Sequence, residues 1–343
     1  MARRVLYNDP EFGIRMVSNV SAGVDHEAGT YLVEANSQGF REAEFQTERR
    51  PGYRRILVYG DSFTYGVGVA KRERFTDLLA AALPDVEVYN LGLIGSGIDS
   101  QYLAHKFVGS NLEFDLILMT PWMENIRRNL DHYREWSDRQ EWSDRQSHGS
   151  VGSLVYQPKP YFEIGSSDEL ELRNYPVPPA IPAPDLDDRL KKELARTRVD
   201  WIRHVLRHNP GVKDFVQRVS RYQPLPQYAD PEGLAWKLMR AIFEMWTSEV
   251  LAPVLVCPIP MHQYIEGYAS PGEAIKRFAE LHRPENGAYV YNCLPALKKG
   301  SRRVRRGYRF ESDVHFTPAG NQAFADAIEG EVRRVLDISV GNH

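Results

Sequence analysis

Short apolar segments that alternate with segments of helical periodicity constrain the fold of this chain more than any other feature. Apolar runs rich in β-forming residues predict strands at residues 55–60, 86–91 and 114–121. Helical stripes lie between them, at residues 75–83 and 101–108. Strands and helices that alternate at this spacing are typical of βαβ units, whose strands run parallel in one sheet.

The alternation stops near residue 130 and resumes about a hundred residues later. We predict further strands at residues 253–258 and 288–293, and helices at residues 232–249 and 273–281. A last helix begins after Thr317, which serves as its N-cap before a proline, and it is predicted to run to about residue 335. The fold class that follows is α/β, a three-layer sandwich with a central, mostly parallel sheet of about five strands.

The interruption divides the 343-residue chain into three parts. We expect residues 1–50 to form an extension packed on the core, and residues 51–130 and 230–343 to form the α/β core. Residues 131–229 are polar and rich in proline, so we expect them to form an insertion or cap. Helical periodicity at residues 186–206 predicts that this insertion is partly helical.

Composition excludes several classes of protein. The net charge of -3 argues against a protein that binds nucleic acid or an anionic membrane surface. Two cysteines, Cys257 and Cys293, cannot form a disulfide scaffold and fit a reducing compartment. No uninterrupted apolar run approaches the ~18 residues of a membrane span. Polar residues at positions 8 and 9 precede any apolar segment, so we expect no signal peptide and a cytoplasmic protein.

The first predicted strand ends in Gly-Asp-Ser-Phe-Thr-Tyr-Gly, residues 60–66. In open α/β sheets, functional groups lie beyond the carboxyl ends of the strands, and Ser62 is at such a point. A serine hydroxyl needs an adjacent base to act as a nucleophile. The alternative is that Asp61 and Ser62 only cap the following helix.

A candidate base lies at the far end of the chain, just before the last predicted helix. His315 has a carboxylate two residues upstream, Asp313, and another at Glu311. An imidazole with a pKa near ~6.5 accepts a proton from serine, and a carboxylate fixes its tautomer. Since this segment follows the last predicted strand, the fold is able to return it to Ser62.

Two further loops contain groups that could stabilise an oxyanion. Gly95 follows the second predicted strand, where a glycine leaves its backbone N–H accessible. Asn125 follows the third strand and has a side-chain amide to donate. Each loop alone is weak evidence, because glycine and asparagine also fill such turns for conformational reasons.

The four segments, in this order and context, resemble the blocks of the SGNH (GDSL-type) hydrolase family. The resemblance covers residues 55–125 and 253–334 and omits the insertion. It implies a flavodoxin-like SGNH hydrolase fold, with Ser62 as nucleophile and His315 as base. The N–H groups of Ser62 and Gly95 and the amide of Asn125 would form the oxyanion hole. Residues 36–41 are also similar to an extension in members associated with bacterial polysaccharide or natural-product gene clusters.

This chain departs from the family pattern at two blocks. The family's acid stands three residues before the histidine, a position that Ser312 occupies here, so the acid is either Asp313 or Glu311. The third block, usually Gly-x-Asn-Asp, reads Met-Glu-Asn-Ile at residues 123–126, which indicates a modified pocket.

Four more residues are candidates for contact with substrate: Asp61, Arg127, Arg128 and His262. A guanidinium binds carboxylates and phosphates in a bidentate manner, although ordinary surface arginines explain the two arginines as well.

The function expected from these residues is a serine esterase or acylhydrolase. It would remove an acetyl or other short acyl group from a carbohydrate or small natural product, through an acyl-enzyme on Ser62 and without a metal or cofactor. The alternatives are an acyltransferase that uses the same acyl-enzyme, or a catalytically inactive SGNH-like binding protein. The sequence does not predict an oligomeric state.

Overall fold

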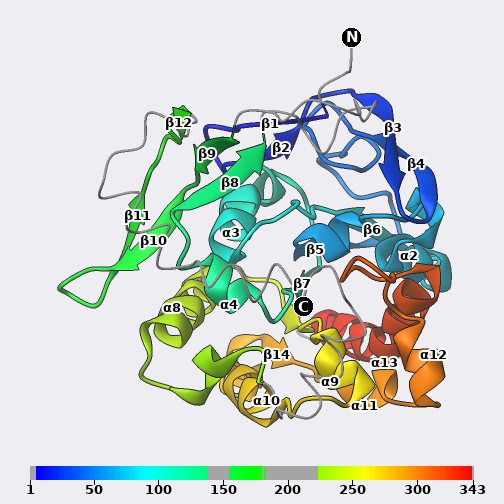
Figure 1. Ribbon diagram of the computed structural model, residues 1–343. Helices are drawn as coiled ribbons and strands as arrows, with labels where there is room; N and C mark the ends of the chain where they lie inside the picture. The colour runs from blue at the N-terminus through cyan, green and yellow to red at the C-terminus, as the bar shows by residue number, and fades with distance from the viewer. Residues whose placement is uncertain (1–4, 138–153, 180, 183–222, 342–343) are drawn as a thin grey trace.

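A parallel sheet of five strands runs through the centre of the molecule, in the order β14-β13-β7-β5-β6 (Figure 1). The computed structural model describes residues 5–137, 154–179, 181–182 and 223–341. All four strand pairings in this sheet are parallel, so the predicted fold class is confirmed. The strands are β5 (Arg54–Gly60), β6 (Val86–Asn90), β7 (Leu116–Thr120), β13 (Val254–Val256) and β14 (Ala288–Val290).

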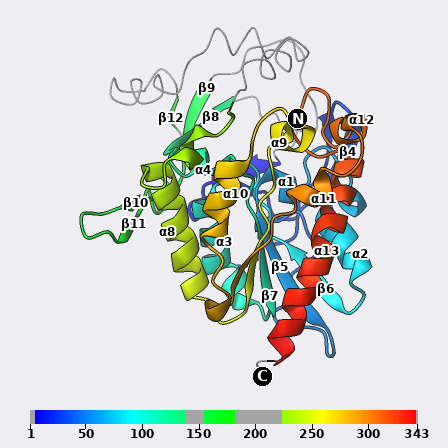
Figure 2. The same ribbon diagram turned by 90° about the horizontal axis from the view of Figure 1, so that it is seen from below.

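Helices cover both faces of the sheet, which explains why its central strands are apolar throughout. In β5 and β7, the residues Ile56, Leu57, Ile117 and Leu118 are all 0% exposed, as expected for a parallel sheet buried on both sides. α2 (Phe75–Ala82) and α13 (Pro318–Gly341) pack together on one face, and α3 (Ile98–Phe107) and α8 (Leu234–Ser248) on the other (Figure 2).

The last helix begins at Pro318, where the sequence predicts it, and continues to Gly341, beyond the predicted end near residue 335. α10 (Gly272–Ala279) follows β13, also close to the prediction. Shorter helices stand in the connecting loops: α1 (Ser62–Tyr65), α4 (Asn125–Arg128), α9 (His262–Glu266), α11 (Leu294–Leu297) and α12 (Arg302–Arg306).

Residues 5–50 contain two antiparallel pairs of strands (blue in Figure 1). These strands are β1 (Leu6–Tyr7), β2 (Arg15–Met16), β3 (Ser21–His26) and β4 (Gly29–Glu34). They share a small apolar cluster of their own, which also contains Tyr65 at the end of α1 and Val67 from the loop that follows. The N-terminal hairpins therefore pack directly against the segment that contains Ser62.

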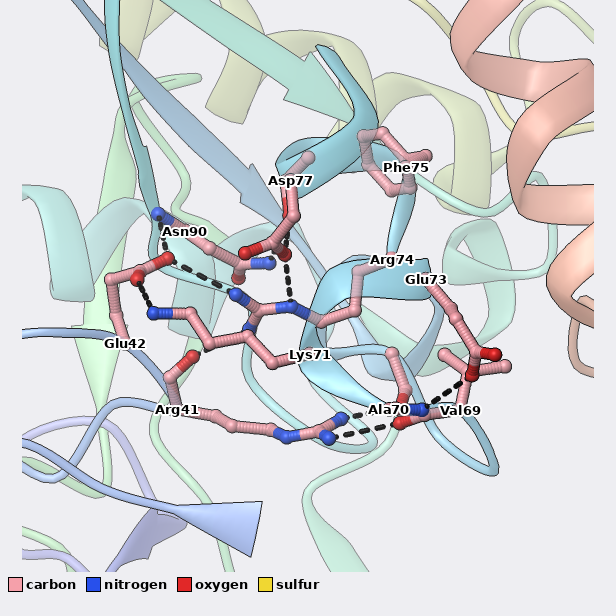
Figure 3. A network of polar contacts seen from close by, with 12 residues as sticks. Arg41, Glu42, Val69, Ala70, Lys71, Glu73, Arg74, Phe75, Asp77 and Asn90 are labelled. Atoms are coloured by element: carbon pink, nitrogen blue, oxygen red, sulfur yellow. Dashed lines mark hydrogen bonds and ion pairs between the residues drawn. The ribbon is translucent and has the colours of Figure 1, made fainter. Parts of the chain in front are cut away.

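A buried ionic network attaches the N-terminal segment to this same loop (Figure 3). The Arg41 guanidinium donates to the carbonyl oxygens of Gly66 (2.6 Å) and Val69 (2.9 Å). Arg74, which is fully buried, donates to Glu42 Oε2 at 3.2 Å and to Asp77 Oδ2 at 2.6 Å. Its charge is therefore neutralised inside the fold, as a buried guanidinium requires.

The described part of the insertion contains strands that lie outside the central sheet (green in Figure 1) and a short 3-10 helix at Pro226–Ala229. β8 (Tyr133–Ser137), β9 (Leu154–Pro158) and β12 (Ile181–Pro182) form one antiparallel sheet, and β10 (Tyr161–Ile164) pairs with β11 (Leu170–Arg173). The aromatic and branched residues of short runs such as β10 favour strands. The helical stripe at residues 186–206 lies outside the described residues.

Candidate active site

Ser62 is the first residue of α1 and comes directly after the carboxyl end of β5. The turn needs a glycine before it, because a Cβ on Gly60 would lie 2.0 Å from Thr64 Oγ1. Asp61 is the N-cap, and its side chain accepts a hydrogen bond from the Phe63 N–H. The first N–H groups of a helix have no partner inside the helix. Accordingly, the Ser62 N–H donates to no other group in the described part of the chain.

His315 lies in the loop before α13, and the fold brings its ring to Ser62. Its Nε2 is 2.7 Å from Ser62 Oγ, and its Nδ1 is 2.7 Å from Asp313 Oδ1. The Phe63 ring packs against the imidazole, with ring centroids 4.9 Å apart. This chain of contacts has the geometry of a serine–histidine–aspartate triad.

The carboxylate beside His315 belongs to Asp313 and not to Glu311. Glu311 is exposed, and its backbone N–H donates to Glu27 Oε1 at 2.5 Å. Burial alone would raise the pKa of Asp313, but the hydrogen bond and the charge of His315, with a further hydrogen bond from His26, hold that pKa well below its usual range. Asp313 is therefore anionic at neutral pH and able to stabilise an imidazolium at position 315.

Sequence reasoning missed His26, at the end of β3. Its Nε2 is 3.0 Å from Asp313 Oδ2, so the carboxylate lies between two imidazoles. The two residues are 287 positions apart, and an Asp-His-Glu at a hairpin turn gives no signal in the sequence. Only the packing of the N-terminal hairpin on the core brings them together.

The candidate oxyanion donors follow two strands of the central sheet: Gly95 lies in the loop after β6, and Asn125 begins α4 after β7. Gly95 has a φ of +65°, and within the described residues its N–H donates to no other group. Asn125, at the start of α4, donates one amide N–H to Asp61 Oδ2 at 3.0 Å. A primary amide has two such donors, so a second N–H remains.

Asp61 and Arg128, two of the predicted substrate contacts, contact each other in the structure. Asp61 is 0% exposed, so it has no surface to offer a ligand. Its Oδ2 accepts from Arg128 Nη1 at 2.9 Å as well as from Asn125. A buried carboxylate needs such partners. Arg128, whose guanidinium also lies 5.2 Å from the ring centre of Trp122, is held inside this cluster.

Arg127 and His262, the other two candidates for contact with substrate, lie in different surroundings. Arg127 donates to the carbonyl oxygen of Pro224 and lies 3.7 Å from Glu124, and neither contact is with Ser62 or His315. His262, at the start of α9, lines a small hollow beside the triad. The hollow is also lined by neighbours of Ser62 and His315, namely Phe63, Val314 and Phe316.

Arg134, the second residue of β8, is another residue that the sequence did not reveal. A Cβ on Gly95 would be 3.6 Å from its Nη1, so the guanidinium lies beside this candidate donor. Burial lowers the pKa of Arg134 to about 10. The insertion thus contributes a cation close to the proposed oxyanion loop.

Among the residues described, no group of three or more His, Cys, Asp or Glu side chains is arranged to hold a metal ion. No described helix is both long and apolar enough to cross a membrane.

Comparison with known proteins gives likeness in structure only. No protein-family model matches the chain, and neither does any curated protein sequence. A member of the lipolytic G-D-S-L family from Veillonella parvula is similar in structure, at 10% identity and a TM-score of 0.42, over 82% of this chain and 99% of that one. A lipase/acylhydrolase from Enterococcus faecalis has 14% identity and a TM-score of 0.39, over 82% and 96% of the two chains. At this distance the likenesses leave the reaction to be argued from the site.

Proposed function

We propose that this chain is a serine acylhydrolase of the SGNH type, with Ser62 as nucleophile. One observation carries the proposal: Ser62 Oγ lies 2.7 Å from His315 Nε2, and the other ring nitrogen of His315 lies 2.7 Å from the Asp313 carboxylate. A serine that only caps a helix has no need of a histidine oriented by an anion. Buried Asp61, and not Ser62, is the N-cap of α1, so the helix does not need the Ser62 side chain as a cap.

The proposed reaction proceeds in two halves. Ser62 Oγ attacks the ester carbonyl carbon while His315 Nε2 takes the hydroxyl proton, and the resulting imidazolium protonates the departing alcohol oxygen. Water then attacks the acyl-enzyme, giving its proton to His315, and Ser62 regains its hydrogen as the acid leaves. The N–H groups of Ser62 and Gly95 and the second amide N–H of Asn125 are the proposed donors to the oxyanion.

We further propose that the acyl group is acetyl or similarly short, on a carbohydrate or small natural product. The size of the hollow beside the triad supports a short group. Its volume is about 10 Å³, counted as the space available to the centre of a water molecule. A cavity needs about this volume to hold one water. A methyl group is of similar size, so a short acyl group would fit this hollow.

Hydrolysis of p-nitrophenyl esters of increasing acyl length tests both parts of the proposal. We expect the parent protein to hydrolyse the acetate faster than the butyrate or octanoate, and Ser62→Ala to show only the background rate. Equal rates for the parent and Ser62→Ala would overturn the proposed nucleophile. A preference for octanoate would overturn the short acyl group but not the nucleophile. Adding a sugar acceptor separates hydrolysis from acyl transfer.

A further inference from the structure

The carboxylate of the proposed triad is held from both sides, and the second holder comes from the N-terminal extension. Asp313 Oδ1 is bound to His315 Nδ1, and Asp313 Oδ2 to His26 Nε2, at 2.7 and 3.0 Å. Since an ionised carboxylate only accepts hydrogen bonds, both ring nitrogens must donate to it. The histidine at position 26 is thus a donor aimed at the far oxygen of the proposed acid.

The surroundings of His26 favour the tautomer that carries its proton on Nε2. Its Nδ1 is buried and has no hydrogen-bond partner. A proton on that nitrogen would be a buried donor without an acceptor, which is costly. A ring with its proton on Nε2 donates to Asp313. His26 therefore acts as a fixed N–H donor to this carboxylate.

The fold holds this ring tightly. Phe310 packs on the imidazole, with ring centroids 4.5 Å apart. On another side is Gly68, whose backbone has a φ of +79° and where a Cβ would lie 2.7 Å from His26 Cε1. Any larger residue at position 68 would collide with the ring. The close approach of a glycine from the loop after α1 therefore gives His26 its place.

The next residue reinforces the same loop by an independent contact. Glu27 accepts the backbone N–H groups of Glu311 and Ser312, at 2.5 and 2.8 Å. The turn between β3 and β4 therefore binds the segment before His315 twice, once through Glu27 and once through His26. Glu27 holds the backbone of that segment, whereas His26 holds the carboxylate itself.

We propose that His26 is a positioning residue of the active site: it fixes the rotation of the Asp313 carboxylate, so that Oδ1 faces His315 Nδ1. Asp313 is partly exposed, with 28% of its side chain accessible, so without His26 its far oxygen would be free to turn toward water. This inference rests on the proposed serine acylhydrolase function. It assigns to the extension a part in that reaction beyond its own packing.

Three variants separate positioning from simple stability. His26→Leu removes the donor at similar volume, His26→Gln keeps an N–H near the position of Nε2, and Glu27→Gln alters only the backbone contact. With p-nitrophenyl acetate we expect His26→Leu to lower kcat by about 10-fold or more, since hydrogen bonds to charged groups are the stronger ones. KM should stay the same. His26→Gln should recover most of kcat. Glu27→Gln should lower the melting temperature and leave kcat nearly unchanged.

Histidine side-chain NMR supplies a readout that does not depend on catalysis. In Ser62→Ala, the Nδ1–H proton of His315 should shift on adding His26→Leu and should return toward its position with His26→Gln. A His26→Leu protein with kcat within two-fold of the parent, or equal losses in His26→Leu and His26→Gln, would overturn the positioning role. If the parent hydrolyses no ester, the proposed function fails, and the NMR comparison alone decides whether His26 orients the Asp313–His315 pair.

Discussion

Ser62 Oγ and His315 Nε2 are 2.7 Å apart although 253 positions separate the two residues in the chain. Each stands at the carboxyl-end edge of the central sheet, Ser62 at the start of α1 and His315 just before α13. Their contact depends on the parallel arrangement of β5 and its neighbours, which directs these loops to one edge. The predictions that follow test the groups around this contact one at a time.

Replacing the acid should abolish most of the activity without a large loss of stability. In Asp313→Asn the amide can present its N–H to His315 and so stabilise the wrong tautomer. We expect kcat for p-nitrophenyl acetate to fall by at least about 100-fold, because a wrong tautomer costs a serine protease up to about 10⁴-fold. Glu311→Gln, at the other carboxylate considered from the sequence, should stay within about two-fold. If the two variants exchange these results, Glu311 is the acid.

Arg128 should prove to be a stabilising residue. Arg128→Met leaves the fully buried Asp61 carboxylate without its cation. Breaking such a pair costs about 3–5 kcal/mol when both partners are buried. Because Arg128 is 21% exposed, we expect on the order of 2 kcal/mol in the free energy of unfolding.

Chemical denaturation of Arg128→Met beside Arg127→Met measures this difference. Arg127 lies 3.7 Å from Glu124, donates to the Pro224 carbonyl and is 33% exposed, so its loss should cost only about 1 kcal/mol. A rise in KM for Arg128→Met with unchanged stability would restore our original expectation that this arginine binds substrate.

Much of the fold is readable from the sequence because a buried parallel sheet needs continuous apolar runs. Residues 55–60 and 86–91 predict β5 and β6 to within a residue at each end. Among the strands of the central sheet, the largest error concerned β14, which ends at Val290 although the predicted strand extends to Cys293. There the chain leaves the edge of the sheet although Cys293 is buried again, so hydrophobicity alone does not mark the end.

The site was only partly predictable, for a physical reason. Ser62, Gly95, Asn125 and His315 follow strands or precede a helix in a regular α/β alternation, so position in the chain implies position at the sheet edge. His26 and Arg134 come from segments outside that alternation. Their distances from Asp313 and Gly95 depend on how an antiparallel hairpin and an insertion pack on the core, which no local pattern encodes.

His105 should make the protein less stable in mild acid. Its ring is buried and its Nδ1 lies 2.9 Å from the Tyr59 hydroxyl. Burial lowers the pKa of His105 to about 4, so the native state resists protonation that the unfolded chain accepts near pH ~6.5. The stability that the neutral His105 ring contributes is fully present above pH ~6.5 and is lost as the pH falls toward about 4. Each tenfold change in proton affinity is worth about 1.4 kcal/mol, so the loss is on the order of 3 kcal/mol.

Urea denaturation of the parent and His105→Gln between pH 7 and pH 4 checks this loss. The variant should be less stable at pH 7, but its stability should fall less steeply with acid. Parallel curves for the two proteins would show that other groups cause the acid dependence.

Arg41 should stabilise the loop behind the nucleophile. Its guanidinium binds carbonyl oxygens of two separate segments, at Gly66 and Val69 in the loop after α1 and at Leu32 in β4. Lysine keeps the charge but lacks the planar fork that reaches several acceptors. We therefore expect Arg41→Lys to lose about 2 kcal/mol or more of unfolding free energy. Arg72→Lys, at an exposed position of the nearby turn, is the matched control and should be neutral; a neutral Arg41→Lys would contradict this account.

Covalent labelling of Ser62 tests the central claim most directly. The parent protein is incubated with a fluorophosphonate, and intact-mass and peptide mass spectrometry then locate the adduct. Our account predicts a single adduct, on the peptide that contains Ser62, and no adduct in Ser62→Ala. Labelling should be at least about 100-fold slower in His315→Gln, since general-base catalysis contributes about 10²–10⁴-fold. Absence of labelling in the folded parent, or equal labelling of the parent and His315→Gln, would contradict it.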